Sequence, residues 1–273
     1  MTSRAVFSSP HSGSDYPSGF MARALLDPIT MRSSEDAFVD QLFGHAPKAG
    51  APMLVARYPR AFVDLNRASD ELDPALVAGA GRGGTNPRVA AGLGVIPRVV
   101  GEGRAIQSGK ITMDEARRRL KMAYTPFHTL LGQILTQQCK RFGSAILFDC
   151  HSMPHDALSS APLVQGRRPN IILGDRFGAA CGHWLIDAAI GIFAAEGFIV
   201  ARNAPFAGGY ITQHYGRPAN GIHALQIEVD RSLYMDERTV SPHAGFRDVS
   251  SRLSRVVAAL AQVADQAPAL AAE

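Results

Sequence analysis

Short runs of aliphatic and aromatic residues recur along the chain, separated by longer stretches in which apolar residues follow a helical spacing. Near-continuous apolar runs such as AILF and NIIL are typical of strands that are covered on both faces. Six strands are therefore predicted, at residues 4–9, 52–58, 145–152, 170–175, 198–203 and 223–230.

The stretches between these runs carry start and stop signals of helices. Thr112 and Glu115 have the spacing of a capping box and open a helix that runs to about residue 140, with a kink expected at Pro126. A second helix is predicted after Asp175, which acts as its N-cap, and it ends at Gly197.

The last predicted helix covers residues 246–266 and has one apolar stripe, made of Val249, Leu253, Val256, Val257 and Leu260. Strands that alternate with helices in this way favour a three-layer α/β fold.

Residues 68–110 interrupt this alternation, because they are rich in glycine and proline and lack a period that would bury one face. A long irregular segment of this kind is usually functional or mobile. Predicted strands continue on both sides of it, so we interpret it as an active-site loop or lid within a single domain that spans residues 1–273. The sequence GAGRGG inside it lacks the glycine order and the preceding strand of a dinucleotide site.

Composition narrows the class of protein. The 273 residues are 46% hydrophobic and carry a net charge of only +4, from 28 basic and 24 acidic side chains. The arginines are scattered, so no surface for nucleic acid is predicted, whereas a small anionic substrate fits the charge. Three cysteines without CxxC spacing, and no apolar run of membrane-spanning length, predict a soluble cytoplasmic protein with no membrane partner.

Two histidines follow or end predicted strands, where ligands gather in open α/β sheets. His11 and Asp15 are four residues apart and would project together if the chain turned into a helix there, and His151 follows the run AILF. Hydrolytic zinc sites use three such ligands. Each residue alone is explained by a turn or a buried carbonyl contact, but the combination favours a metal site, with His155 as an alternative third ligand and Asp149 as a partner that orients His151.

A carboxylate inside an apolar strand marks a second candidate. In HALQIEVD, alternation places Gln226, Glu228 and Asp230 on one face of the strand. Burying Glu228 costs free energy unless it is paired or functional, so a general base is favoured over a salt bridge to Arg231 or Arg202.

The tetrapeptide DLNR follows the second predicted strand. Asn66 and Arg67 suit the capture of a substrate carboxylate, although a turn explains the same residues. The glycines of NAPFAGGYIT would allow the backbone to approach a ligand closely, or make a hairpin.

Seven segments, taken in order, resemble the N-formylglutamate amidohydrolase family. They are SSPHSGSDYP, DLNR, GVIPR, DCHSMP, GDRFG, NAPFAGGYITQHYGRP and GIHALQIEVDRSLYMDE, and they extend from residue 8 to residue 237. The family is similar in fold to the zinc carboxypeptidases and aspartoacylases, so the resemblance implies a mixed, mostly parallel sheet flanked by helices, of the phosphorylase/hydrolase-like type.

The resemblance implies hydrolysis of N-formyl-L-glutamate to formate and L-glutamate, a late step of one route of histidine degradation. It makes His11, Asp15 and His151 ligands of one divalent metal, expected to be Zn²⁺, and Glu228 the general base.

Substrate binding is implied for five further residues. Asn66 and Arg67 match the family motif, and Arg98, Arg202 and Arg231 are additional candidates for the two carboxylates of the substrate. Two other functions remain open at this point: a deacylase or carboxypeptidase with a different specificity, and a non-catalytic, metal-dependent binding module for acidic amino acids. The sequence predicts no oligomeric state.

Overall fold

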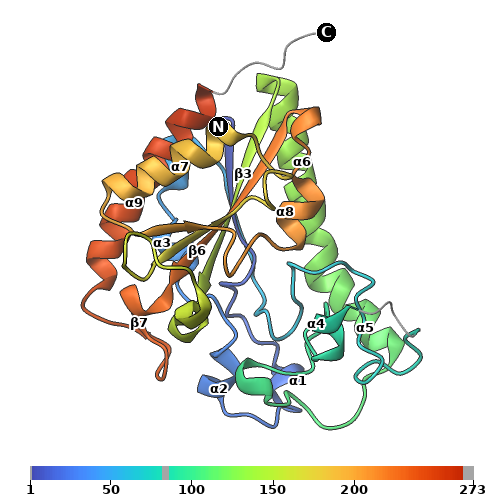
Figure 1. Cartoon of the computed structure of the whole chain (residues 1–273). Helices are drawn as coiled ribbons and strands as arrows, with labels where there is room; N and C mark the ends of the chain where they lie inside the picture. Colours follow the sequence, from blue (N-terminus) through green and yellow to red (C-terminus); the bar gives the residue numbers. More distant parts are fainter. Residues whose placement is uncertain (1, 82–85, 267–273) are drawn as a thin grey trace.

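A six-stranded sheet forms the centre of the molecule (Figure 1), in a computed structural model that describes residues 2–81 and 86–266. The strand order is β2-β1-β3-β6-β4-β5. All neighbours are parallel except β4 and β6, so the predicted mixed, mostly parallel sheet is confirmed. The strands are β1 (Ala5–Ser9), β2 (Met53–Val55), β3 (Ala145–Met153), β4 (Ile171–Gly174), β5 (Val200–Arg202) and β6 (Ile222–Asp230).

Helices cover both faces of this sheet. One face packs against α3 (Val39–Leu42), α7 (His183–Ala195) and α9 (Phe246–Asp265), and the other against α6 (Thr125–Phe142). The shorter elements are α1 (Ser18–Met21), α2 (Pro28–Arg32), α4 (Pro87–Ala90), α5 (Met113–Arg119), α8 (Tyr210–Tyr215) and a small ribbon of β7 (Met235–Asp236) and β8 (Ser241–Pro242).

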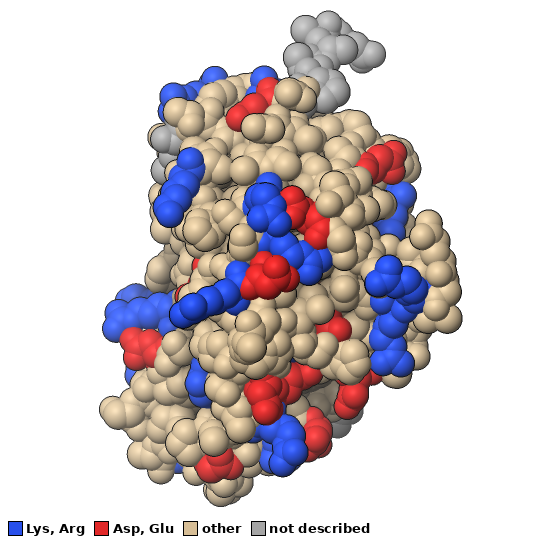
Figure 2. Space-filling model, turned by 90° about the vertical axis from the view of Figure 1, so that its left-hand side faces the viewer, with Lys and Arg blue, Asp and Glu red and all other residues tan. Residues whose placement is uncertain are grey.

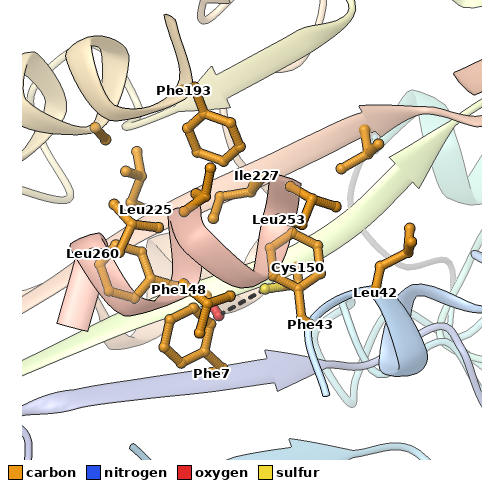
Figure 3. Packing of buried hydrophobic residues seen from close by; sticks show 14 of the residues in the cluster. Phe7, Leu42, Phe43, Phe148, Cys150, Phe193, Leu225, Ile227, Leu253 and Leu260 are labelled. Atoms are coloured by element: carbon orange, nitrogen blue, oxygen red, sulfur yellow. Dashed lines mark hydrogen bonds between the residues drawn. The ribbon is translucent and has the colours of Figure 1, made fainter. Parts of the chain in front are cut away.

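The face toward α9 is apolar over most of its length. Figure 3 shows Phe7, Phe148 and Leu225 of the sheet in one cluster with Leu253 and Leu260 of α9, and all five side chains are fully buried. The apolar stripe predicted for this helix is therefore confirmed.

The opposite face is apolar near the strand starts and polar near the strand ends. Val6, Leu147 and Ala224 lie side by side near the strand starts and are buried under α6. Two residues further along β1, β3 and β6, the same face becomes polar.

Ser8, Asp149 and Gln226 form the next row on that face, and His151 then lies opposite Glu228. Because β1, β3 and β6 are parallel, these polar side chains meet at one edge of the sheet. The fold thus places predicted functional residues side by side by strand register alone.

The predicted helix that starts at Thr112 is present but interrupted. The Thr112 hydroxyl accepts a hydrogen bond from the amide of Glu115 at 3.2 Å, and a π-helical turn (Leu120–Tyr124) separates α5 from α6. This turn ends two residues before Pro126, which has no amide hydrogen to donate to the helix.

The helix predicted to follow Asp175 begins only at His183. Arg176 and Phe177 have φ angles of 54° and 58°, which a right-handed helix does not allow. Asp175 is therefore not its N-cap and instead binds Arg202.

The irregular segment at 68–110 packs on the α6 side of the sheet, where it buries Leu76, Val77, Ile96 and Ile106. Residues 82–85 of this predicted loop or lid, which include the end of GAGRGG, lie outside the described residues.

No helix in the described part of the chain has the length and hydropathy of a transmembrane span. On the face seen in Figure 2, basic and acidic side chains lie interspersed, in keeping with the small net charge.

Candidate metal centre and active-site cavity

Two histidines and an aspartate converge at the polar edge of the sheet. His11 follows β1, His151 lies in β3, and Asp36 lies in the loop before α3; all three are buried. Asp36 Oδ2 is 3.3 Å from His11 Nδ1 and 2.9 Å from His151 Nδ1. Burial alone would raise the pKa of Asp36, but the two histidines outweigh it and hold that pKa well below its usual value.

The outer nitrogen of each imidazole binds a second carboxylate. His11 Nε2 is 2.8 Å from Asp64 Oδ1, and His151 Nε2 is 2.9 Å from Asp149 Oδ2, as predicted for Asp149. When Nε2–H donates to these carboxylates, the Nδ1 lone pairs of both rings face Asp36.

This arrangement fits a metal ion. The ligand atoms of His11, Asp36 and His151 lie within 4.8 Å of one another. His11 Nδ1 is buried without a hydrogen-bond partner, which is costly unless a ligand satisfies it. Two imidazole nitrogens and one carboxylate oxygen are a donor set of hydrolytic zinc sites, so this group could hold a divalent metal.

Asp15, predicted as the third ligand, is not part of this group. Its side chain is 47% exposed and forms an ion pair with Arg57 at 2.7 Å. The prediction assumed a helix directly after the strand, whereas the chain is irregular until α1 begins at Ser18. His155, the alternative ligand, pairs with Asp230 at 2.9 Å instead.

Asp36 was missed because it lies 25 positions after His11 and shares no local spacing with it. The signal available in the sequence was the pair Glu35 and Asp36 directly before the apolar residues AFV. Both carboxylates are buried, and the amide of Asp36 donates to the His11 carbonyl at 3.0 Å.

Arg231 lines the site, and each of its three nitrogens donates one hydrogen bond to the protein. Nη2 donates to Asp36 Oδ1 at 3.0 Å, Nε to Ser152 Oγ at 3.2 Å, and Nη1 to the Ser33 carbonyl at 3.1 Å. Arg231 therefore orients Asp36, and its predicted contact with substrate stays a prediction.

Glu228 lies beside His151 on β6 and is 7% exposed. Burial raises the pKa of Glu228 to about 7, although the nearby charge of His151 opposes the shift. Gln226 Nε2 donates to Glu228 Oε1 at 2.8 Å. A carboxylate poised near neutral pH at a cavity wall has the property of a general base.

A cavity of about 490 Å³ opens over these residues. Of the predicted substrate-binding residues, Asn66, Arg67 and Arg231 line it. Arg98 and Arg202 are not among its lining residues, because each is turned toward a carboxylate elsewhere: Arg98 Nε is 2.8 Å from Asp73 and Arg202 Nη2 is 2.6 Å from Asp175. Two further arginines of the lining, Arg60 and Arg88, were not predicted from the sequence.

The carbonyls on either side of Asn66 are held by α6 and the turn before it. The Tyr124 hydroxyl donates to the Arg67 carbonyl, and His128 Nε2 donates to the Leu65 carbonyl, each at 2.9 Å. Burial lowers the pKa of His128 to about 4, so the ring stays neutral and its Nδ1 accepts from the Tyr215 hydroxyl.

Asn66 itself is fixed from the opposite side. Its Oδ1 accepts from the amide of Ile211 at 2.7 Å, and its Nδ2 lies 3.3 Å from His151 Nε2. A Cβ atom at Gly209 would lie 2.4 Å from Asn66 Nδ2, which is too close for both to stay in place.

Gly209→Ala is therefore expected to displace Asn66 and to lower kcat/KM by about 10- to 100-fold, since misplacement near 1 Å has effects of this size. Metal content should not change. Gly191→Ala in α7 is the matched control, because its added Cβ meets nothing within 4 Å. Equal kinetics of the two variants would show that the fit of Gly209 against Asn66 does not matter for activity.

The profile of the N-formylglutamate amidohydrolase family matches residues 3–235. N-formylglutamate deformylase of Pseudomonas aeruginosa is 32% identical over 92% of this chain and 89% of its own length, and that of Pseudomonas putida is 34% identical over 85% and 82%.

Solved structures agree. The crystal structure of N-formylglutamate amidohydrolase from Ralstonia eutropha JMP134 superimposes with a TM-score of 0.88 and 32% identity, covering 97% of this chain and 95% of that one. A protein from Agrobacterium tumefaciens shares the fold alone, with a TM-score of 0.67 and 14% identity over 96% and 90% of the two chains. The chain therefore belongs to the N-formylglutamate amidohydrolase family, as an amidohydrolase that acts on a linear amide.

Proposed function

We propose that this chain hydrolyses N-formyl-L-glutamate to formate and L-glutamate, using one Zn²⁺ ion bound by His11, Asp36 and His151. The observation that carries the proposal is the convergence of two histidine Nδ1 atoms on Asp36, with Glu228 next to His151 on the neighbouring strand. We infer the substrate from the two Pseudomonas relatives, which are N-formylglutamate deformylases. The reaction would then belong late in one route of histidine degradation.

A divalent metal at this position would lower the pKa of water and polarise the amide carbonyl. Glu228 takes a proton from the water that attacks the formyl carbon. As the carbon–nitrogen bond breaks, Glu228 passes this proton to the departing amine of glutamate.

Arg60 supplies positive charge for the oxyanion that develops on the formyl oxygen. It lines the cavity, its Nε donates to Asp64 at 2.9 Å, and its charge lowers the pKa of Glu228 against the larger effect of burial. Asn66 and Arg67 hold the α-carboxylate of the substrate, as the DLNR motif implies.

The segment 68–110 acts as the active-site loop of a single α/β domain in this proposal. Support comes from its residues Leu93, Pro97 and Val99, which line the cavity beside the metal group. A cytoplasmic location is supported by the three cysteines, which are all free.

A panel of N-formyl, N-acetyl and N-succinyl amino acids, assayed with and without chelator, tests the proposal. We expect N-formyl-L-glutamate to have the highest kcat/KM, chelator to abolish its turnover, and added Zn²⁺ to restore it. A preference for another acyl group would instead support a deacylase of different specificity. Tight binding without turnover of any N-acyl glutamate by zinc-loaded protein would contradict an enzymatic role.

A further inference from the structure

Four arginines line the cavity, and two of them are held by carboxylates. Arg60 donates to Asp64 at 2.9 Å, and Arg231 donates to Asp36 at 3.0 Å. Both guanidinium groups therefore help to organise the metal group.

The other two, Arg67 and Arg88, are not engaged in this way. Arg67 is 7% exposed, its Nε has no hydrogen-bond partner, and Asp64 Oδ2 is 3.8 Å away from it. The guanidinium of Arg88 takes part in no ion pair or hydrogen bond with the described residues; only its backbone is bound, the amide to Asn86 Oδ1 at 3.0 Å and the carbonyl by the Leu93 amide at 2.8 Å.

The positive charges of Arg67 and Arg88 interact with each other. Burial lowers the pKa of Arg67, the carboxylate of Asp64 opposes this shift, and the positive charge of Arg88 adds to it. Arg88 has no carboxylate partner among the described residues, and Arg67 has only Asp64 at 3.8 Å, so the two cations favour a ligand that brings two negative charges.

Arg67 is buried, whereas Arg88 is exposed, so the two side chains would meet different parts of a ligand. Arg67 adjoins Asn66, which reaches His151 at 3.3 Å, so it serves a carboxylate close to the reacting amide. Arg88 is an exposed residue of α4, in the irregular segment. Arg98 keeps this short helix in place, because its Nη2 donates to the Ala90 carbonyl at 3.4 Å while its Nε binds Asp73.

We propose that Arg88 binds the side-chain carboxylate of the substrate and thereby makes the enzyme selective for acidic N-acyl amino acids. This inference rests on the proposed function, with Arg67 at the α-carboxylate. It assigns selectivity to a residue outside the seven sequence segments that resemble the family.

The test compares N-formyl-L-glutamate with N-formyl-L-glutamine, which differ only in a side-chain carboxylate and a neutral amide of similar shape. Arg88→Met should lower kcat/KM for the glutamate compound by about 10- to 100-fold, the loss of one charge-assisted contact, with most of the change in KM. The glutamine compound should change by less than about threefold, since a neutral amide loses little from removal of the charge. Arg88→Lys should retain part of the preference.

Arg117→Met is the matched control, because it removes the same charge from an exposed helix position and leaves the cavity untouched. It should change neither substrate. An equal loss with both compounds in Arg88→Met, or no loss with N-formyl-L-glutamate, would overturn the inference while wild-type turnover still supports the proposed function. Wild-type protein that hydrolyses neither compound would contradict both.

Discussion

Glu228→Gln is expected to lower kcat by about 10²- to 10⁴-fold, the contribution typical of a positioned general base. Gln cannot take the proton of water, yet it keeps an oxygen that can accept the hydrogen bond from Gln226. Formate release measures the loss, and elemental analysis should find the same metal content as in the wild type. Turnover by the variant comparable to that of the wild type would show that Glu228 is not the general base.

The same substitution should stabilise the metal-free protein at alkaline pH. The pKa of Glu228 is about 7 in the folded chain against 4.5 in the unfolded one, so the folded state holds its proton more tightly. Stability contributed by this group therefore falls as pH rises from about 4.5 past 7, by about 3 kcal/mol in total. Gln does not titrate, so Tm measured in chelator should match the wild type near pH 4.5 and exceed it by roughly 6–12 °C at pH 8. A constant difference across pH would contradict the raised pKa.

Asp36→Asn is expected to remove the metal, whereas Asp15→Asn is expected to retain it. Asp36 bridges the two histidines, and Asp15 is paired with Arg57 at the surface. Loss of a ligand should weaken metal affinity by well over the roughly 10- to 100-fold seen for the partners that merely orient ligands. Metal content after dialysis and turnover with limiting Zn²⁺ measure the difference.

A second variant separates loss of the metal from loss of the fold, because Asp36→Asn also leaves the buried Arg231 without its carboxylate. His11→Ala removes a different ligand and should also abolish metal binding, with circular dichroism confirming the fold. If Asp15→Asn lost the metal and Asp36→Asn kept it, the ligand set assigned to this site would be wrong.

The strands and their polar faces were predictable from the sequence because they depend on a local period. Alternation along 223–230 placed Gln226, Glu228 and Asp230 on one face, and the structure has Gln226 and Glu228 lining the cavity. The catalytic role of Glu228 stays a prediction, but its position did not need any distant residue to be known.

The third residue of the candidate metal group and the arginine partners were not predictable in this way. Asp36, Asp73 and Asp175 reach their partners from other segments of the chain, and the short-range spacing of His11 and Asp15 pointed elsewhere. Contacts between distant segments depend on the packed fold, so local patterns select the wrong partner when several carboxylates are available.

The pairing of β3 with β6 holds His151 and Glu228 in a stable part of the fold, whereas Arg88 lies in a part that can vary more easily. His151 and Glu228 face each other on long, buried, paired strands, so their amide hydrogens should be among the slowest to exchange with solvent. Arg88 lies on the four-residue helix α4, whose few backbone hydrogen bonds should open early. Mutagenesis of residues 86–104 can therefore be used to select new acyl amino acid preferences, while the hydrolytic groups keep their spacing.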